Sequence, residues 1–211
     1  MKKLLPLIAL LLFAACHDDE YHYPPVRLEF LTATTGSDGA LHSVLTDNGQ
    51  SFAVLEDASN TRTTPDTLLR IVSNYEQQTD NGVKLYAVAA AVAPLPRPAA
   101  SFPEGVKRSP ASVTSIWMGL NYLNILLDVK AQDKRHSFGF VEEENTLDPV
   151  AGTRTVRLSL YHDDNGDRQA YSQRAYLSIP LQSYLEAHTP TTIYFTATDY
   201  NGTPHSYRFS F

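Results

Sequence analysis

Short stretches in which every second residue is apolar recur along the chain from residue 26 onward. The first places Val26, Leu28 and Phe30 on one side and Arg27 and Glu29 on the other. This period of two is typical of a strand with one buried face, because successive strand side chains point to opposite sides. We therefore expect the fold to begin with a half-buried strand.

Four more stretches of this kind follow before residue 93, separated by turn-forming sequences. They lie near residues 41–46, 51–55, 69–75 and 83–89. Asn48-Gly49 favours a type I′ hairpin turn, in which both central residues have positive φ. Five short strands with no room for a long helix predict a small OB-like barrel over residues 26–93.

Residues 94–105 interrupt the pattern with Pro94, Pro96, Pro98 and Pro103. Proline has no backbone N–H and cannot donate to a sheet ladder. This segment is interpreted as a stiff linker between two domains.

Alternation resumes in residues 106–211. The stretch Tyr122–Lys130 follows Trp117, and a tryptophan next to an alternating strand is typical of a sandwich core. Leu181–His188 has the spacing of about two turns of helix. Regular strands with one such tryptophan and one edge helix predict an immunoglobulin-like β-sandwich, so the chain as a whole is expected to be all-β.

The first 15 residues read as a secretory signal. Two lysines precede an apolar run, Leu4–Phe13, which is too short for a spanning helix and is followed by Ala14-Ala15-Cys16. An ordinary secretory cut would leave Cys16, the only cysteine, as a free thiol. The order of residues instead resembles a bacterial lipobox, so Cys16 is expected to carry lipid and to anchor the protein in a membrane.

Residues 16–25 form the expected lipidated tether. Asp18, Asp19 and Glu20 follow the lipid cysteine directly. The run resembles the acidic export tag that sends lipoproteins of some Gram-negative bacteria to the outer face of the outer membrane. A solvated acidic tether is the other interpretation, because short acidic runs are common in disordered segments. The outer membrane is the expected location, and surface exposure is the open question.

Charge narrows the classes of partner. The chain carries a formal charge of −6, which becomes more negative when Lys2 and Lys3 leave with the signal, and it has no basic block. Such a chain is a poor match for phosphate backbones, so nucleic acid is not an expected partner.

Residues with catalytic or metal-binding chemistry do not assemble in a recognised pattern. Gly-x-Ser-x-Gly is absent. Glu142–Glu144 are expected at an exposed hairpin tip, where nothing raises a carboxyl pKa. His162–Asp167 lacks the glycine and glutamate positions of a calcium loop and reads as a polar turn. His17 and His22 lack a third ligand. We expect no metal, no cofactor and no catalytic residue, although two acids that meet only in the folded chain would escape notice.

Trp117 and Tyr122 are the candidate binding aromatics. If both are exposed, they could stack on sugar rings, and the alternative for Trp117 is the sandwich core. OB-like barrels bind oligonucleotides and oligosaccharides on one face. For an acidic chain, a glycan or a protein is the expected ligand.

Several segments resemble the NigD-like lipoproteins, and together they span nearly the whole chain after the signal. They are Thr35–Gly39, Thr46–Gly49, Arg70–Tyr75, Ile116–Asn124, Leu160–Asp163 and Ser178–Leu181. The resemblance implies an OB-like N-terminal domain joined to a β-sandwich C-terminal domain, in agreement with the pattern. The resemblance implies little about activity, because the family takes its name from a bacteriocin gene cluster and fold does not supply function. It gives no catalytic residues to carry over to this sequence.

Three functions follow as hypotheses. The first is a non-catalytic binding or scaffold lipoprotein of the outer membrane or cell surface. The second is a bacteriocin-associated or immunity-type lipoprotein. The third is a carbohydrate-active hydrolase whose acid pair is not recognisable in the sequence.

Overall fold

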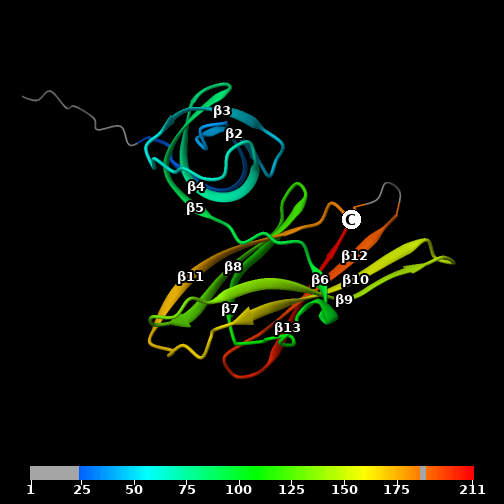
Figure 1. Ribbon diagram of the computed structural model, residues 1–211. Helices are drawn as coiled ribbons and strands as arrows, with labels where there is room; N and C mark the ends of the chain where they lie inside the picture. The colour runs from blue at the N-terminus through cyan, green and yellow to red at the C-terminus, as the bar shows by residue number, and fades with distance from the viewer. Residues whose placement is uncertain (1–23, 186–188) are drawn as a thin grey trace, which may run out of the picture.

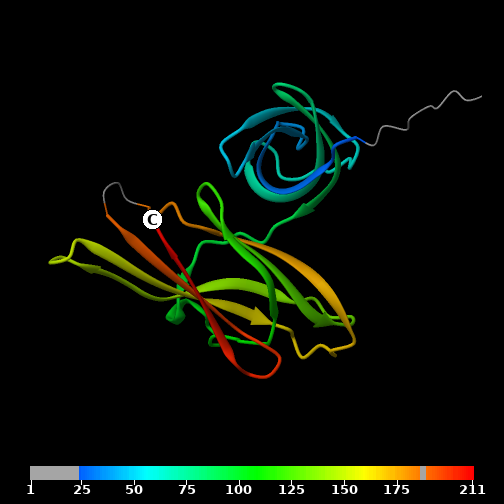
Figure 2. The ribbon, with the colours of Figure 1, turned by 180° about the vertical axis from the view of Figure 1, so that it is seen from behind.

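The computed structural model describes residues 24–185 and 189–211, which form two all-β units, a barrel and a sandwich (Figures 1 and 2). The barrel strands are β1 (Arg27–Thr35), β2 (Leu41–Thr46), β3 (Ser51–Asp57), β4 (Leu68–Thr79) and β5 (Gly82–Ala90). They close in the order β1-β2-β3-β5-β4, with β3 and β5 parallel. The five-stranded barrel that the alternation predicted is confirmed.

The interior of the barrel is not lined by the apolar face that the sequence suggested for β1. Leu31 and Ala33 are fully buried in the barrel core, together with Ile71 and Tyr75 of β4. Phe30 lies on the opposite, outer face. The interpretation of residues 26, 28 and 30 as the core side is therefore wrong, because this face of β1 turns toward the second domain.

The turn between β2 and β3 also differs from the prediction. Gly49 has a φ of 86°, but Asn48 is not among the described residues with positive φ, so the turn is not type I′. The amide of Gly49 donates to the carbonyl of Thr46 and the Thr46 amide donates to the carbonyl of Gln50. The turn is stabilised instead by hydrogen bonds that the side chains of Thr46, Asn48 and Gln50 make within it.

The sandwich packs two sheets on one apolar core. The larger has the order β13-β12-β10-β9-β6 and the smaller β11-β8-β7. Their strands are β6 (Arg97–Pro98), β7 (Ser112–Met118), β8 (Tyr122–Ala131), β9 (Ser137–Asp148), β10 (Thr153–Asp163), β11 (Tyr171–Pro180), β12 (Thr191–Thr198) and β13 (Pro204–Ser210). The predicted sandwich is thus confirmed, and its pair β10 and β12 is parallel.

Two segments depart from the sequence interpretation. Within 94–105, β6 pairs with β9 and the 3-10 helix η1 (Ala99–Ser101) follows it, so part of the proline-rich segment belongs to the larger sheet. The helix expected at Leu181–His188 is a hydrogen-bonded turn through residue 185, and residues 186–188 lie outside the described part.

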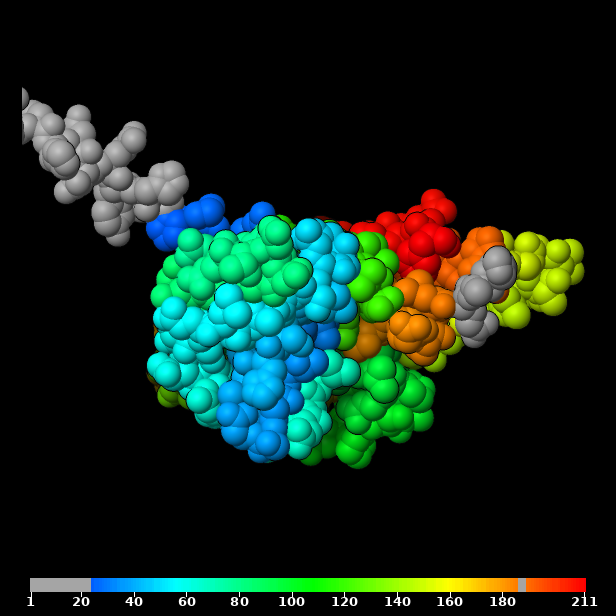
Figure 3. Space-filling view, turned by 90° about the horizontal axis from the view of Figure 1, so that it is seen from above, coloured from blue at the N-terminus to red at the C-terminus, as the bar shows by residue number. Residues whose placement is uncertain are grey.

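The barrel sits against the outer face of the smaller sheet. Side chains of β8 alternate strictly: Leu123, Ile125 and Leu127 enter the sandwich core, while Asn124 and Leu126 point to the other side. Seen from above, the barrel covers part of the sandwich, and the yellow-green β9–β10 hairpin projects beyond it (Figure 3). This placement creates the boundary on which the candidate site lies.

Candidate functional site

An open cleft of about 360 Å³ lies between the barrel and the sandwich. The barrel contributes β1, β4 and the β2–β3 turn, and the sandwich contributes β7, β8 and β11. The lining is mostly apolar or aromatic, and its residues are Leu28, Glu29, Phe30, Asp47, Asn48, Val72, Trp117, Met118, Leu126, Arg174 and Tyr176. A concave, mainly apolar site at a domain boundary with a few polar groups is the usual form of a small-molecule site.

Three aromatic rings form one side of this cleft. The ring of Phe30 meets that of Trp117 edge to face, with centroids 5.5 Å apart, and it lies 6.1 Å from the ring of Tyr176. Trp117 remains 37 % exposed. The placement of Trp117 in the sandwich core is therefore wrong, because its side chain points away from the core toward the barrel. Its role in binding stays a prediction.

Tyr122, the second predicted aromatic, lies close by but does not line the cleft. The guanidinium carbon of Arg70 is 4.2 Å from the centre of its ring. Such cation–π contacts are attractive when the cation is desolvated. Tyr122 therefore belongs to the contact that joins the two domains.

Arg70 is the centre of that contact, and its side chain is only 1 % exposed. It lies on the outer face of β4, where its Nη2 donates to both carboxylate oxygens of Asp47 at 2.6 Å and to Asn124 Oδ1 at 3.0 Å. Its Nε donates to Ser178 Oγ at 3.0 Å. Ser178 Oγ also donates to Asn124 Oδ1, and Asn124 Nδ2 donates to Asp47. We call these four residues the Arg70 junction.

The junction joins a barrel ion pair to two buried side chains of the sandwich. Asn124 and Ser178 are both fully buried. A buried charge is tolerated only where it is paired and its remaining hydrogen bonds are satisfied, and both conditions hold for Arg70. Because the bonds cross the domain boundary, they fix the two walls of the cleft relative to each other.

Gly119 makes room for the junction at the end of β7. A Cβ atom at this position would lie 2.3 Å from Asp47 Oδ2 and 2.9 Å from Asn124 Nδ2. Both atoms already take part in the junction. Only glycine allows the β7–β8 turn to approach the carboxylate this closely.

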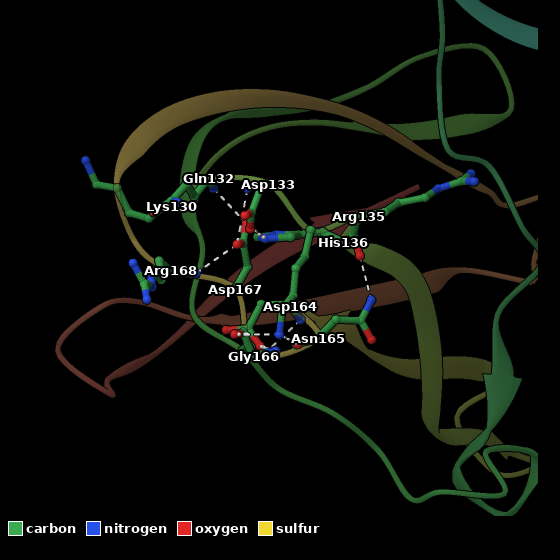
Figure 4. Close-up of polar contacts among 12 residues, drawn as sticks. Lys130, Gln132, Asp133, Arg135, His136, Asp164, Asn165, Gly166, Asp167 and Arg168 are labelled. Carbon is green, nitrogen blue, oxygen red and sulfur yellow. Dashed lines mark hydrogen bonds and ion pairs between the residues drawn. The ribbon is translucent and has the colours of Figure 1, made fainter.

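A second group of polar residues lies at the far turns of the sandwich (Figure 4). Asp167 accepts hydrogen bonds from the amides of Gln132, Asp133 and Arg168, and these hold the pKa of its carboxyl far below the usual range. Its Oδ2 lies 3.4 Å from His136 Nε2. The turn predicted at 162–167 therefore uses a carboxylate to tie two loops together.

The two histidines at these turns are in contact. His162 Nδ1 lies 2.9 Å from the carbonyl oxygen of Ser109, so this nitrogen carries the proton and donates. His162 Nε2 lies 3.0 Å from His136 Nδ1 and accepts from it. Burial, the largest cause, lowers the pKa of His162, and the nearby His136 acts in the same direction. The arrangement ties together the loops that carry the two histidines and Ser109.

The acidic run Glu142–Glu144 is not at a hairpin tip, contrary to the prediction. These residues lie within β9, and the tip falls near residues 149–152. Partial burial opposes ionisation of Glu143, but hydrogen bonds from Ser159 and Arg108 outweigh it and lower its pKa. Glu142 accepts from Tyr184, whose pKa is raised by burial and by this bond.

The predicted lipid and export residues, Cys16, Asp18, Asp19 and Glu20, lie outside the described residues, as do His17 and His22. Sequence reasoning missed Arg70, Asp47, Phe30 and Leu126. A single arginine in an otherwise apolar stretch, residues 68–72, is the one signal that could have marked the junction.

Comparisons with known proteins place the chain in a family. Residues 97–211 match the model of the NigD-like C-terminal beta sandwich domain. A NigD-like immunity protein from Bacteroides caccae is 36 % identical, with a TM-score of 0.75, over 90 % of this chain and 99 % of that one. No curated protein matches.

Two more distant solved structures show the fold alone. A protein of unknown function from Bacteroides vulgatus is 17 % identical with a TM-score of 0.67, over 88 % of this chain and 90 % of that one. A candidate lipoprotein from Bacteroides fragilis is 10 % identical with a TM-score of 0.58, over 88 % of this chain and 96 % of that one. On the strength of the family model and the Bacteroides caccae relative, this chain belongs to the NigD-like family.

Proposed function

We propose that this protein is a lipid-anchored, non-catalytic binding protein of the outer membrane, with the cleft between barrel and sandwich as its ligand site. The observation that carries the proposal is the cleft itself. It holds a partly exposed tryptophan and its two walls are fixed by buried bonds. A site held in shape before binding loses less entropy when the ligand enters.

The pKa shifts of the carboxyl groups in the described residues favour binding over catalysis. Each carboxyl group whose pKa departs from its ordinary value has it lowered; these groups are Asp38, Asp128, Glu143, Asp148, Asp167 and Asp199. A general acid needs the opposite shift. In the cleft, both oxygens of Asp47 are engaged by Arg70. Strand alternation turns the Glu29 side chain away, where Tyr75 donates to it.

The anchor at Cys16 supplies the location. The described residues include no helix with the length and hydropathy to cross a bilayer. The Bacteroides fragilis relative is named as a candidate lipoprotein, which supports the same assignment. We propose that Asp18, Asp19 and Glu20 direct the protein to the cell surface.

Labelling with an alkyne fatty acid tests the anchor. The wild-type protein should take up the label and fractionate with the outer membrane, whereas Cys16→Ser should not. Protease treatment of whole cells then tests on which side of the outer membrane the protein lies. Digestion on intact cells supports surface exposure, and replacement of all three acidic residues by alanine should protect the protein. Protection of the wild type would overturn the surface assignment.

The single tryptophan allows a direct test of the cleft. 5-Fluorotryptophan incorporated into the full mature chain carrying Cys16→Ser gives one fluorine resonance, which reports on Trp117 alone. The probes are neutral oligosaccharides, uronic-acid oligosaccharides, short neutral apolar peptides and a monoacylglycerol. At least one set should shift the resonance in a saturable way.

A pair of matched variants decides whether the shift arises in the cleft. Leu126→Asn changes the cleft wall and should weaken the response, whereas Leu147→Asn changes an exposed position on β9 and should not. If none of the four probe sets shifts the resonance, the cleft is not the ligand site and the proposal is overturned.

Immunity to a bacteriocin is the second candidate function. It is favoured by the name of the Bacteroides caccae relative, which covers nearly the whole chain at 36 % identity. Deletion of the gene should then sensitise the host to the bacteriocin, and expression from a plasmid should restore protection. Unchanged sensitivity after deletion would remove this candidate.

A further inference from the structure

We infer that the cleft takes a neutral saccharide, with a sugar ring stacked on Trp117. The inference rests on the proposed function, because it names the ligand class of that same site. It is argued from the charge balance of the cleft, the hydrogen-bonding capacity left on its polar side chains, its aromatic surface and its size.

Both charged side chains that point into the cleft are already neutralised. Asp47 pairs with Arg70, and Arg174 pairs with Asp128 through Nε and Nη2 at 3.1 and 3.4 Å. The Asp128 partner raises the pKa of Arg174, and Arg174 lowers that of Asp128. A charged ligand would have to compete with these bonds, so the complementary ligand carries no net charge.

The same polar side chains keep some hydrogen-bonding capacity. Among the described residues, Arg174 Nη1 has no hydrogen-bond partner, so both of its N–H groups are free to donate. Asn48 Nδ2 uses one N–H on Gln50 Oε1 and keeps the other. Asp47 remains 20 % exposed and has a further lone pair to offer. The cleft thus presents hydrogen-bond donors and an acceptor. Each of these side chains is fixed in position by another hydrogen bond or ion pair.

Hydroxyl groups fit this mixture, because each can donate and accept at once. A purely hydrocarbon ligand would bury the same polar groups without partners, which is unfavourable for each of them. The neutral ligand is therefore rich in hydroxyls. This requirement separates a saccharide from a fatty acyl chain.

The aromatic wall supplies the other half of the recognition. Trp117 and Tyr176 are accessible from the cleft, and the buried Phe30 supports both rings. The C–H face of a sugar ring is apolar, while its edge carries the hydroxyls, so one ligand matches both parts of the lining. The volume is near the lower end of the range of about 300–1,000 Å³ for small-molecule sites, which favours one or two sugar rings.

Titration of the fluorine-labelled protein with neutral di- to tetrasaccharides tests the inference. At least one should shift the Trp117 resonance with a dissociation constant below about 1 mM. The affinity should change less than about twofold between about 50 mM and about 500 mM salt, because no net charge is neutralised on binding.

Variants locate the ligand. Measured by calorimetry, Trp117→Leu should weaken saccharide binding by about tenfold or more, Arg174→Met by about fivefold, and the control Leu147→Asn not at all. Trp117→Phe keeps an aromatic face and should retain part of the affinity. Thermal unfolding of each variant verifies that it is folded.

The outcomes separate the two proposals. If only the apolar peptides or the monoacylglycerol shift the resonance, the saccharide inference is wrong while the cleft remains the ligand site. If uronic-acid oligosaccharides bind more tightly, with a steep salt dependence, the neutral class is wrong. If nothing binds, both proposals fall. Shortened saccharides after incubation would overturn the non-catalytic assignment.

Discussion

The two parts of the domain boundary are built in opposite ways. The Arg70 junction is polar and buried, with a guanidinium, a carboxylate, an amide and a hydroxyl in mutual contact. The adjoining cleft is mainly apolar and open. Protein interfaces usually bury the apolar part and leave the polar part at the rim. This protein shows the reverse order, which is what we expect if the polar contacts set the geometry of the boundary and the apolar cleft takes the proposed ligand.

Removal of Arg70 should have the largest effect on this division of roles. Arg70→Ala leaves Asp47 and Asn124 without their donor inside the boundary, and we expect a loss of about 3–5 kcal/mol in the free energy of unfolding. Chemical denaturation measures the loss, and small-angle scattering should show separated domains. Arg157→Ala, which breaks an exposed pair with Glu144, should cost less than about 1 kcal/mol. Equal effects of the two variants would contradict a structural role for the junction.

Gly119→Ala tests the junction by crowding rather than deletion. The added methyl group would meet a carboxylate that Arg70 and Asn124 hold in place, so we expect a loss of about 1–3 kcal/mol. Gly139→Ala in β9 is the matched control, because its nearest contact would be 3.7 Å from Tyr161 Cβ. It should be neutral or slightly stabilising. If Gly119→Ala is equally harmless, the approach of the turn to Asp47 is not tight.

Trp117→Ala should cost less stability than a buried aromatic does. Full truncation of a core tryptophan costs about 3–5 kcal/mol, but Trp117 is 37 % exposed, so we expect about 1–2 kcal/mol. Thermal unfolding measures the change. A loss as large as that of Arg70→Ala would mean that the cleft holds the domains together as much as the junction does.

Acidic pH should weaken the far end of the sandwich, where His162 lies. The fold lowers the pKa of His162 below its unfolded value of about 6.5. At a pH between these two pKa values, His162 is protonated in the unfolded chain and neutral in the folded protein. Stability should therefore fall as the pH drops below about 6.5, by at most about 1.4 kcal/mol per pH unit. Urea unfolding at several pH values measures this slope. His162→Gln should remove it, and His42→Gln, at an exposed ion pair, should not.

The alternation of apolar residues was sufficient to predict both domains, because a half-buried strand needs one apolar face. It could not tell which face is inside. In β1, residues 26, 28 and 30 appeared to form the core side, yet Leu28 is 62 % exposed and Phe30 faces the sandwich. The true interior also includes two polar residues, Thr35 of β1 and Ser73 of β4. Their hydroxyl groups donate to backbone carbonyls, and a sequence pattern cannot show such bonds.

The candidate site could be predicted only in part. Trp117 was singled out in the sequence and lines the cleft, but the residue that its ring meets, Phe30, lies in the other domain. Arg70 and Ser178 are 108 residues apart in sequence, and nothing local to either residue indicates that they meet. The segments on which the family resemblance rests do contain all four junction residues, Asp47, Arg70, Asn124 and Ser178. Their shared role became evident only from the fold.

The continuity of the barrel strands along the chain has a consequence for the order of folding. Residues 27–90 close a barrel without any strand from the sandwich, so the barrel can complete its hydrogen bonds before the sandwich forms. Until the domains meet, Arg70 and Asp47 remain hydrated on its surface. Docking must then remove the water from Arg70 and most of it from Asp47, and we expect this step to limit the rate of the last refolding phase.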